Sequence, residues 1–325
     1  MIKINDIWKN RILTVLKITV TILFFFIIFY KVNFFTILEK LKNISWYYFL
    51  IAILLIILMQ VQQVLRWQVL LKVKIPTLPS FMKLFKYHLF GLFFQLFLPS
   101  TISGDLLRAW RLARTLPNKT DSYSSALFSR LVGLLIFFIL GLLLFIVFPS
   151  TFMILPAIQR MSVIAVYLLL FIALYLIFSP SVTRYLAGIF NIKLWQKGLH
   201  KIADFQTSIN EYRRSPRVIM ITFFITLGIY FCMIINTWIV FLAFGRHLPF
   251  YAIFAYTPII YIIQLLPISL NGSGIREISM YFFFKTYGIT IDDIALYAII
   301  GYGSVIAVNM VGGLTMIYDS IMHRN

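Results

Sequence analysis

The sequence has almost no cysteine and few histidines, which excludes several kinds of site. Its only cysteine, Cys232, lies in an apolar run, so no intramolecular disulfide and no thiolate metal cluster can form. The four histidines lack the H-x3-H and H-E-x-x-H spacings of zinc sites, and Walker, dinucleotide-binding and G-x-S-x-G motifs are missing too. We therefore expect no metal, no cofactor and no catalytic residue. Whether the chain is an enzyme stays open, with the motifs favouring a protein that is not one.

Acidic residues are also scarce. The chain has 10 Asp and Glu residues against 29 Lys and Arg residues, a formal net charge of +19 at pH 7. In a soluble protein this surplus would suggest a nucleic-acid partner. Here 61% of the residues are hydrophobic, 12% are charged and the mean hydropathy is +0.93, values typical of a polytopic membrane protein. Because the basic residues lie in loops beside apolar runs, topology and anionic lipids explain them, and we expect no nucleic acid.

Long apolar runs predict membrane-spanning helices. A helix needs about 20 residues to cross the hydrocarbon core of a bilayer. Six runs have about this length: 12–30, 46–65, 126–148, 161–178, 218–244 and 295–318. The sequence thus predicts an all-α polytopic membrane protein, with a single integral membrane domain over residues 1–325.

Loop charge predicts the orientation of these spans. Loops 66–86 and 184–217 have an excess of Lys and Arg, which places them and both termini in the cytoplasm. Loops 149–160 and 245–249 then lie outside. The basic N-terminus has no A-x-A-like cleavage site, so we expect a retained first helix in the cell inner (cytoplasmic) membrane. Within 184–217, apolar residues fall on or near one face of a helix, as in an amphipathic linker on the membrane surface.

Two short segments share the pattern P-x4-G-x3-R. They cover residues 99–108 and 267–276, and a glutamine precedes each, Gln95 and Gln264. Backbone that is broken inside a membrane is stable only where protein buries it or where it lines a wet cavity. Broken segments at matching positions of two halves point to the substrate site of a transporter-like fold. The structural alternative is that Pro and Gly only kink two helices.

Segment lengths around these motifs predict two oppositely oriented helical hairpins. The apolar run 87–98 is too short to span, so the first motif forms a re-entrant hairpin that enters from the cytoplasm. The second motif enters from the opposite face, which makes an inverted repeat with halves of roughly 46–148 and 218–318. Pro99 and Pro267 should then approach each other near the bilayer midplane. Because the second apolar arm is long enough to span, eight crossings with broken ends stay an alternative.

The first motif carries a candidate anion site. Gly104 and Asp105 stand at the start of a predicted helix, where exposed N–H groups and the helix dipole favour an anion. Arg108 and Arg111 follow on neighbouring positions, and guanidinium pairs suit bidentate binding of phosphate. Two alternatives stay open. Asp105 caps the helix and pairs with Arg108, or positive-inside topology alone places the arginines here.

The second motif offers the turn residues Asn271, Gly272 and Gly274, followed by the adjacent charges Arg276 and Glu277. A charge in a membrane segment faces a partner or a wet cavity. Either these two charges pair with groups across the repeat interface, or Arg276 meets a lipid phosphate directly.

Arg130, in the third predicted span, is the remaining intramembrane cation. Its alternative role is an interfacial arginine that snorkels to the headgroups. We expect Arg108, Arg130 and Arg276 to face one enclosed or laterally open cavity, because three unpaired charges would be costly in lipid. Asp105 and Glu277 should lie near enough to orient or partly neutralise them.

Four segments carry a family resemblance: Leu65-Arg66-Trp67, Ser103-Gly104-Asp105-Leu-Leu-Arg108-Ala-Trp, Ser129-Arg130-Leu-Val-Gly133-Leu and Pro267 through Arg276-Glu277. Over most of its length the chain resembles the flippase-like membrane domain of the lysylphosphatidylglycerol synthase family. It departs from the family pattern at Ser103, which replaces a glycine, and at Ser129, which replaces an aspartate. Asn271 and Ser273 also replace residues of a Gly-rich turn.

This resemblance implies an expected function. In full-length relatives a cytosolic aminoacyltransferase domain makes lysylphosphatidylglycerol, and the membrane domain moves the product outward. No transferase domain occurs in this sequence, so a lysyltransferase label would be inherited from fused relatives, and we expect no aminoacyl transfer. Stand-alone relatives imply lipid-linked sugars or other lipids as substrates.

The leading hypothesis is a lipid translocase, flippase-like, that moves an anionic or lipid-linked headgroup across the cytoplasmic membrane. The alternative is a membrane subunit or enzyme of lipid modification that serves aminoacyl- or glycosyl-transfer to a lipid. A third reading is a membrane scaffold whose cavity is only structural. Expected partners are a membrane phospholipid or a polyisoprenyl-linked lipid, with a separate transferase as a further candidate.

Overall fold

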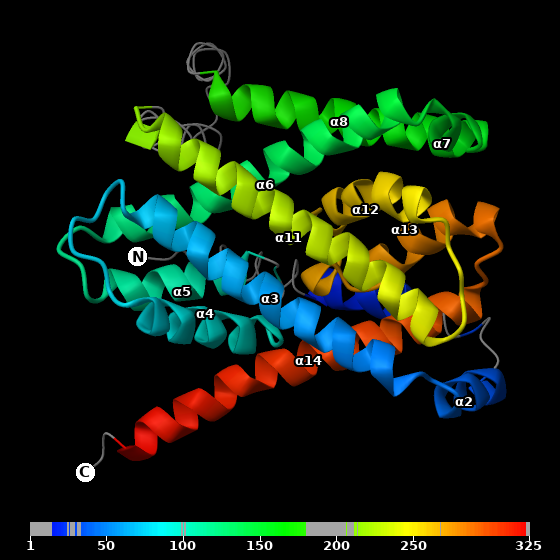
Figure 1. The fold of residues 1–325 in the computed structure, drawn as a ribbon, viewed down its shortest axis with the longest axis horizontal. Coiled ribbons are helices and arrows are strands. Elements are labelled where there is room, and N and C mark those ends of the chain that lie inside the picture. The colour runs from blue at the N-terminus through cyan, green and yellow to red at the C-terminus, as the bar shows by residue number, and fades with distance from the viewer. Residues whose placement is uncertain are drawn as a thin grey trace.

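The computed structural model describes residues 15–24, 26, 30, 34–98, 100, 102–179, 206, 211–212, 214–266 and 268–322. Every regular element in these ranges is a helix (Figure 1). The shorter ones are α2 (Phe34–Lys42), α7 (Pro149–Met153) and the 3-10 turns η1 (Leu270–Gly272) and η2 (Lys285–Tyr287). The all-α fold class is therefore confirmed.

Five helices in this part of the chain are long and apolar enough to cross a membrane. They are α3 (Trp46–Leu71), α6 (Lys119–Val147), α8 (Ala157–Phe178), α11 (Pro216–Ala243) and α14 (Ile291–Met322). Each covers one of the six predicted runs, and a shorter apolar helix, Val15–Phe24, lies within the remaining run, 12–30. The chain is a polytopic membrane protein, as its composition indicates.

Two pairs of short helices lie between the long ones. The first pair is α4 (Phe81–Gln95) and α5 (Ser103–Ala113), and the second is α12 (Phe250–Gln264) and α13 (Ile275–Phe284). Helices α4 and α12 have 15 residues each, which at 1.5 Å per residue makes them about 22 Å long, shorter than the roughly 30 Å of a hydrocarbon core. Each pair has the geometry of a helical hairpin. That the hairpins enter from opposite membrane faces stays a prediction.

The same order of elements occurs twice. A long helix, a hairpin and a second long helix follow one another as α3, α4–α5, α6, and again as α11, α12–α13, α14. Helix α11 packs along α3, and Figure 1 shows the first hairpin toward one end of the long axis and the second toward the other. This order corresponds to the predicted halves 46–148 and 218–318, whose relation by a symmetry axis stays a prediction.

Close backbone contact places the first hairpin against the last helix. A Cβ atom at Gly312 of α14 would overlap the carbonyl oxygen of Leu89 in α4, and one at Gly91 of α4 would overlap the backbone of Gly104 in α5. Small residues permit such approach in a membrane, where van der Waals packing holds helices together. Around the second hairpin, large buried aromatic side chains fill the core: Tyr230, Phe241, Tyr256, Phe283 and Phe284.

Ion pairs connect neighbouring segments near each end of α3. Before its start, Asp293 of α14 is fully buried and lies 2.9 Å from both Lys40 of α2 and Arg246 after α11. After its end, Lys74 pairs with Glu211 at 3.2 Å. The loops predicted to lie outside are thus separated from those predicted to be cytoplasmic. Most of the predicted linker 184–217 and both chain termini lie outside the described residues.

Candidate functional site

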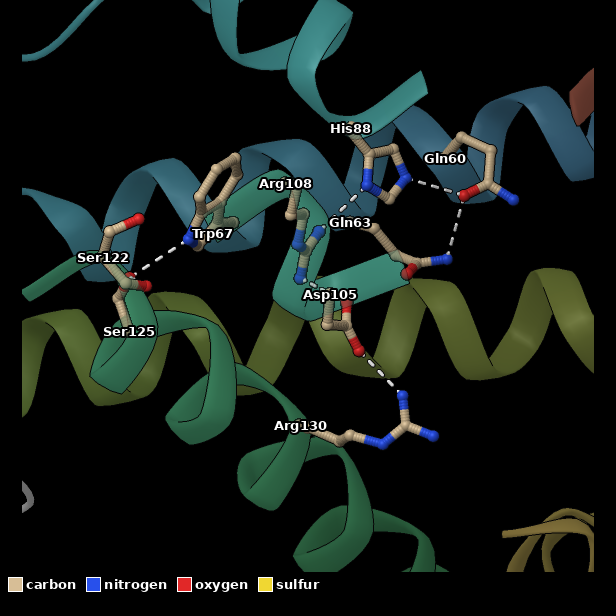
Figure 2. A network of polar contacts seen from close by, with 9 residues as sticks. All are labelled: Gln60, Gln63, Trp67, His88, Asp105, Arg108, Ser122, Ser125 and Arg130. Atoms are coloured by element: carbon tan, nitrogen blue, oxygen red, sulfur yellow. Dashed lines mark hydrogen bonds and ion pairs between the residues drawn. The ribbon is translucent and has the colours of Figure 1, made fainter. Parts of the chain in front are cut away.

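The first motif begins helix α5 and places a carboxylate between two arginines. Asp105 lies in the first turn of α5, 2.8 Å from Arg108 Nη2 and 2.7 Å from Arg130 Nη1. Arg108 is one turn further along α5, and Arg130 comes from α6 (Figure 2). The pairing of Asp105 with Arg108, left open by the sequence, is observed. The same carboxylate also pairs with Arg130, so this arginine has a partner within the protein.

A neutral histidine supports Arg108 from the other side. Arg108 is 1% exposed, its guanidinium lies 4.8 Å above the Trp67 ring, and its Nη1 lies 3.0 Å from His88 Nδ1. Because a guanidinium only donates, Nδ1 accepts, and the proton of His88 sits on Nε2. That nitrogen donates to Gln60 Oε1 at 2.9 Å, and Gln63 donates to the same oxygen at 3.2 Å (Figure 2). The network joins α3, α4 and α5.

Hydroxyl groups fix the tryptophan beneath Arg108. Trp67 Nε1 donates to Ser125 Oγ at 3.1 Å, and Ser125 donates to the Ser122 carbonyl at 2.8 Å. Ser122 in turn donates to the Ala109 carbonyl at 2.8 Å, and all of these residues are fully buried. The chain of bonds connects α3 to α6 and α5. The position of the Arg108 guanidinium is therefore set by three helices.

Arg66 of α3 is a further buried arginine beside this cluster. It is 8% exposed, and its Nη1 donates to Thr226 Oγ1 of α11 at 3.3 Å. A Cβ atom at Gly133 would lie 3.3 Å from the same nitrogen. Because Gly133 is one turn beyond Arg130 in α6, the Arg66 guanidinium packs against α6 close to that arginine.

The second motif forms a turn with unusual backbone angles. Asn271, Gly272 and Gly274 have φ values of 50°, 74° and 83°. Glycine adopts positive φ without steric cost, and asparagine is the side chain that tolerates it best. Asn271 can therefore replace a glycine in the turn that is Gly-rich in the family that the chain resembles. Helix α13 begins directly after the turn, at Ile275.

The start of α13 carries a buried ion pair. Glu277 is fully buried and accepts the Gly274 N–H at 2.7 Å, which stabilises the first turn of the helix. Its other oxygen accepts from Arg276 Nε at 2.7 Å. Tyr302 of α14 donates to Glu277 at 3.3 Å, and its ring lies 4.5 Å from the Arg276 guanidinium. The two charges thus pair with each other, and among the described residues neither has an ion pair with the other repeat.

The two motifs meet through amide side chains. Gln95 Nε2, at the end of α4, donates to Asn271 Oδ1 at 3.2 Å. Each preceding glutamine also packs on the glycine of its own motif. A Cβ atom at Gly104 would overlap Gln95, and one at Gly272 would overlap Gln264. The repeated pattern in the sequence is therefore a repeated packing arrangement in the structure.

The predicted site residues fall into two clusters. Asp105, Arg108 and Arg130 form the first, which we call the Asp105 cluster, and Arg276 with Glu277 forms the second. No ion pair joins the two clusters in the described part of the chain. The two motifs are joined by the hydrogen bond from Gln95 to Asn271. That Arg108, Arg130 and Arg276 face one cavity stays a prediction. That these residues bind a substrate stays a prediction.

The remaining predicted residues have other surroundings. The Arg111 guanidinium lies 4.4 Å above the Phe90 ring and makes no described contact with the Asp105 cluster. Gly104 is buried where α4 and α5 approach each other. Pro99 and Pro267 lie outside the described residues, so their expected approach stays a prediction.

His88 and Arg66 were missed as site residues. The histidines have no zinc spacing, so the sequence gives no sign that His88 binds an arginine, and in the described residues no group of His, Cys, Asp and Glu can hold a metal. A usable signal was the polar stripe of Gln60, Gln63 and Arg66, which interrupts an apolar span at intervals of about one helical turn.

An apolar pocket lies beside this network, between α3, α4 and α14. Its one polar lining residue is Gln60, which is bonded to His88 and through it to Arg108. The lining residues are Ile53, Ile57, Gln60, Phe85, Leu89, Ala307, Val308 and Val311. The pocket thus offers an apolar surface that leads to the buried polar network.

The family described as "Lysylphosphatidylglycerol synthase TM region" matches residues 14–313, nearly the whole chain. No curated protein and no solved structure matches. With its all-α fold, two short hairpins and buried arginines, the chain belongs to the family of lysylphosphatidylglycerol synthase TM regions.

Proposed function

We propose that the protein is a lipid translocase that moves a lipid with an anionic headgroup across the cytoplasmic membrane. The observation that carries this proposal is the hydrogen bond between Gln95 and Asn271. It brings together two broken segments, each of which is followed by a buried arginine, Arg108 or Arg276. Discontinuous helices at corresponding positions of two repeats form the substrate site in many transporters. The family membership supports a role in lipid handling.

The Asp105 cluster is accessible enough to receive a headgroup. The side chains of Asp105 and Arg130 are 18% and 21% exposed, whereas that of Arg108 is 2% exposed. Guanidinium groups bind phosphate oxygens through charge-assisted hydrogen bonds. A phosphate that approaches this edge meets Arg130 first, while Arg108 holds Asp105 in place behind it.

The apolar pocket suits the other half of such a substrate. Its lining is aliphatic and aromatic apart from Gln60. A lipid tail in this pocket would lie beside Gln60, whose bonds to His88 and through it to Arg108 connect the pocket to the Asp105 cluster. An amphiphilic molecule is thereby matched at both ends, which a soluble anion is not.

The orientation in the cytoplasmic membrane is part of the proposal. We place both termini and the loops that contain Lys74 and Glu211 in the cytoplasm, because these loops carry the basic excess. The native Cys232 is buried and does not interfere with labelling. Thr77→Cys should react only from the cytoplasmic side and Ser150→Cys only from the outside. The opposite pattern would reverse the orientation.

Exchange of labelled lipid between the two leaflets of a vesicle membrane tests the function. The purified chain is reconstituted into proteoliposomes that contain fluorescent phosphatidylglycerol or fluorescent phosphatidylcholine, and a membrane-impermeant quencher reports the outer leaflet. We expect the protein to raise the rate of phosphatidylglycerol exchange well above that of protein-free vesicles, and above that of phosphatidylcholine. No acceleration for either lipid would contradict the proposal.

A further inference from the structure

The region around Asp105 contains more positive than negative charge. Among the described residues it holds three guanidinium groups, of Arg66, Arg108 and Arg130, and one carboxylate, of Asp105. The imidazole of His88 is neutral, because its Nδ1 accepts from Arg108. Three positive charges and one negative charge leave a formal surplus of +2. Charges inside a membrane protein are paired or face a ligand, so the surplus indicates an anion that binds here.

Arg66 is the member of this group that has no carboxylate beside it. It is 8% exposed, its Nη1 contacts only the neutral hydroxyl of Thr226, and its Nε has no hydrogen-bond partner in the described part of the chain. Arg108 Nε is buried without a partner as well. Arg66 lies close to the Asp105 cluster, because a Cβ atom at Gly133, one turn after Arg130 in α6, would lie 3.3 Å from Arg66 Nη1. The unfilled Nε of Arg66 is a donor from which a phosphate oxygen can accept a charge-assisted hydrogen bond.

On the basis of the proposed function, we propose that Arg66 binds the headgroup and that the site selects a lipid with a terminal phosphate monoester. A phosphate monoester has a second pKa of about 6 and carries close to two negative charges above pH 7. It neutralises the surplus of +2, whereas a phosphodiester, with one negative charge, leaves half of it. A headgroup with an added ammonium group, as in an aminoacylated lipid, fits least well.

The arrangement also indicates how a monoester is distinguished from a diester. Asp105 and Arg130 form the accessible edge, and Arg66 lies deeper, between α3, α6 and α11. A terminal phosphate has three free oxygens, enough to contact Arg130 at the edge and Arg66 behind it. A diester phosphate has two free oxygens and a substituent on each side, which hinders approach to the deeper arginine.

A comparison of the transport rates of two lipids at pH 8 tests this assignment. Proteoliposomes contain labelled phosphatidic acid, a monoester, or labelled phosphatidylglycerol, a diester, with wild type, Arg66→Gln, Arg66→Lys or Arg114→Gln. We expect wild type to move phosphatidic acid about tenfold faster, the effect of one further charge-assisted contact. Arg66→Gln should remove this preference and Arg66→Lys should keep part of it. Arg114→Gln should match wild type, because Arg114 is exposed and stacks on Trp110.

A pH series gives a second test that needs no variant. Below about pH 6 phosphatidic acid becomes a monoanion, so the ratio of its rate to that of phosphatidylglycerol should fall toward one. A ratio that does not change between pH 8 and pH 5 overturns the assignment, and so do equal rates for the two lipids at pH 8. In both cases translocation itself still stands.

A binding measurement distinguishes failure of the proposed function from failure of the monoester site. If no lipid moves in wild-type vesicles, the proposed function fails, and thermal unfolding in detergent with added phosphatidic acid decides about the site. A larger rise in Tm for wild type than for Arg66→Gln supports the monoester site without translocation. Equal rises in Tm, or none in either protein, overturn it.

Discussion

Replacing Asp105 by asparagine removes the only carboxylate from the Asp105 cluster and leaves the shape of the side chain almost unchanged. Arg108 lies 2.8 Å away with a side chain 2% exposed, and Arg130 lies 2.7 Å away with a side chain 21% exposed. Removing one partner of a buried ion pair costs about 3–5 kcal/mol, because a buried charge is left uncompensated. The more exposed Arg130 pair adds about 0–1 kcal/mol. We therefore expect Asp105→Asn to lower the free energy of unfolding by roughly 3–6 kcal/mol, mostly through Arg108.

Thermal and denaturant unfolding of the purified protein in detergent measures this loss. Asp121→Asn is the matched control, because Asp121 also lies in the first turn of a helix, α6, and has no ion pair among the described residues. Its loss should be about 0.3–1 kcal/mol, the usual contribution of an acid at a helix start. If Asp105→Asn costs no more than this control, then the buried pair with Arg108 does not stabilise the fold, and the reasoning about charge at this cluster is refuted.

Three further experiments test other contacts in the structure. A double-mutant cycle of Gln95→Leu and Asn271→Leu should give a coupling of about 0.5–1.5 kcal/mol in unfolding free energy, and a coupling of zero would show that the motifs do not touch. Gly312→Ala should lower the free energy of unfolding by about 1–3 kcal/mol, because the new methyl group overlaps the backbone of α4. Gly303 has open space around it, so Gly303→Ala should not lower this free energy, and equal effects of the two changes would contradict the close packing. His88→Phe should cost about 1–3 kcal/mol in thermal unfolding, since a buried arginine nitrogen loses its acceptor, and an unchanged Tm would argue against the hydrogen bond.

Hydropathy was sufficient to predict the long helices. Runs such as 161–178 and 218–244 are apolar on almost all sides, so their helical state depends on local composition and not on distant partners. The motif pattern also held locally, because a turn with positive φ needs residues such as Asn271 and Gly272 at fixed positions. The observed ends differ by several residues, as for α6, which begins at Lys119 instead of 126.

Apart from the local pair of Asp105 with Arg108, the partners of the buried charges could not be predicted, since they depend on tertiary packing. Arg66 contacts Thr226, which is 160 residues away, and no local pattern encodes that distance. The tautomer of His88 follows from its contact with Arg108 and not from the residues beside it in the sequence. For Arg276 the sequence left open a partner across the repeat interface or a lipid phosphate, and in the structure its nearest carboxylate is that of the next residue in the chain.

The central claim is that the Asp105 cluster binds the headgroup of a lipid during transport, and Arg130→Gln tests it most directly. This change removes a guanidinium from the accessible edge and leaves the Asp105 pair with Arg108 in place. The measurement is the rate of phosphatidylglycerol exchange in proteoliposomes, taken with Tm in detergent. We expect the rate to fall by about tenfold or more, the effect of one lost charge-assisted contact, while Tm changes little. An unchanged rate together with a collapse of Tm would contradict the claim and would show that Arg130 has only a structural role.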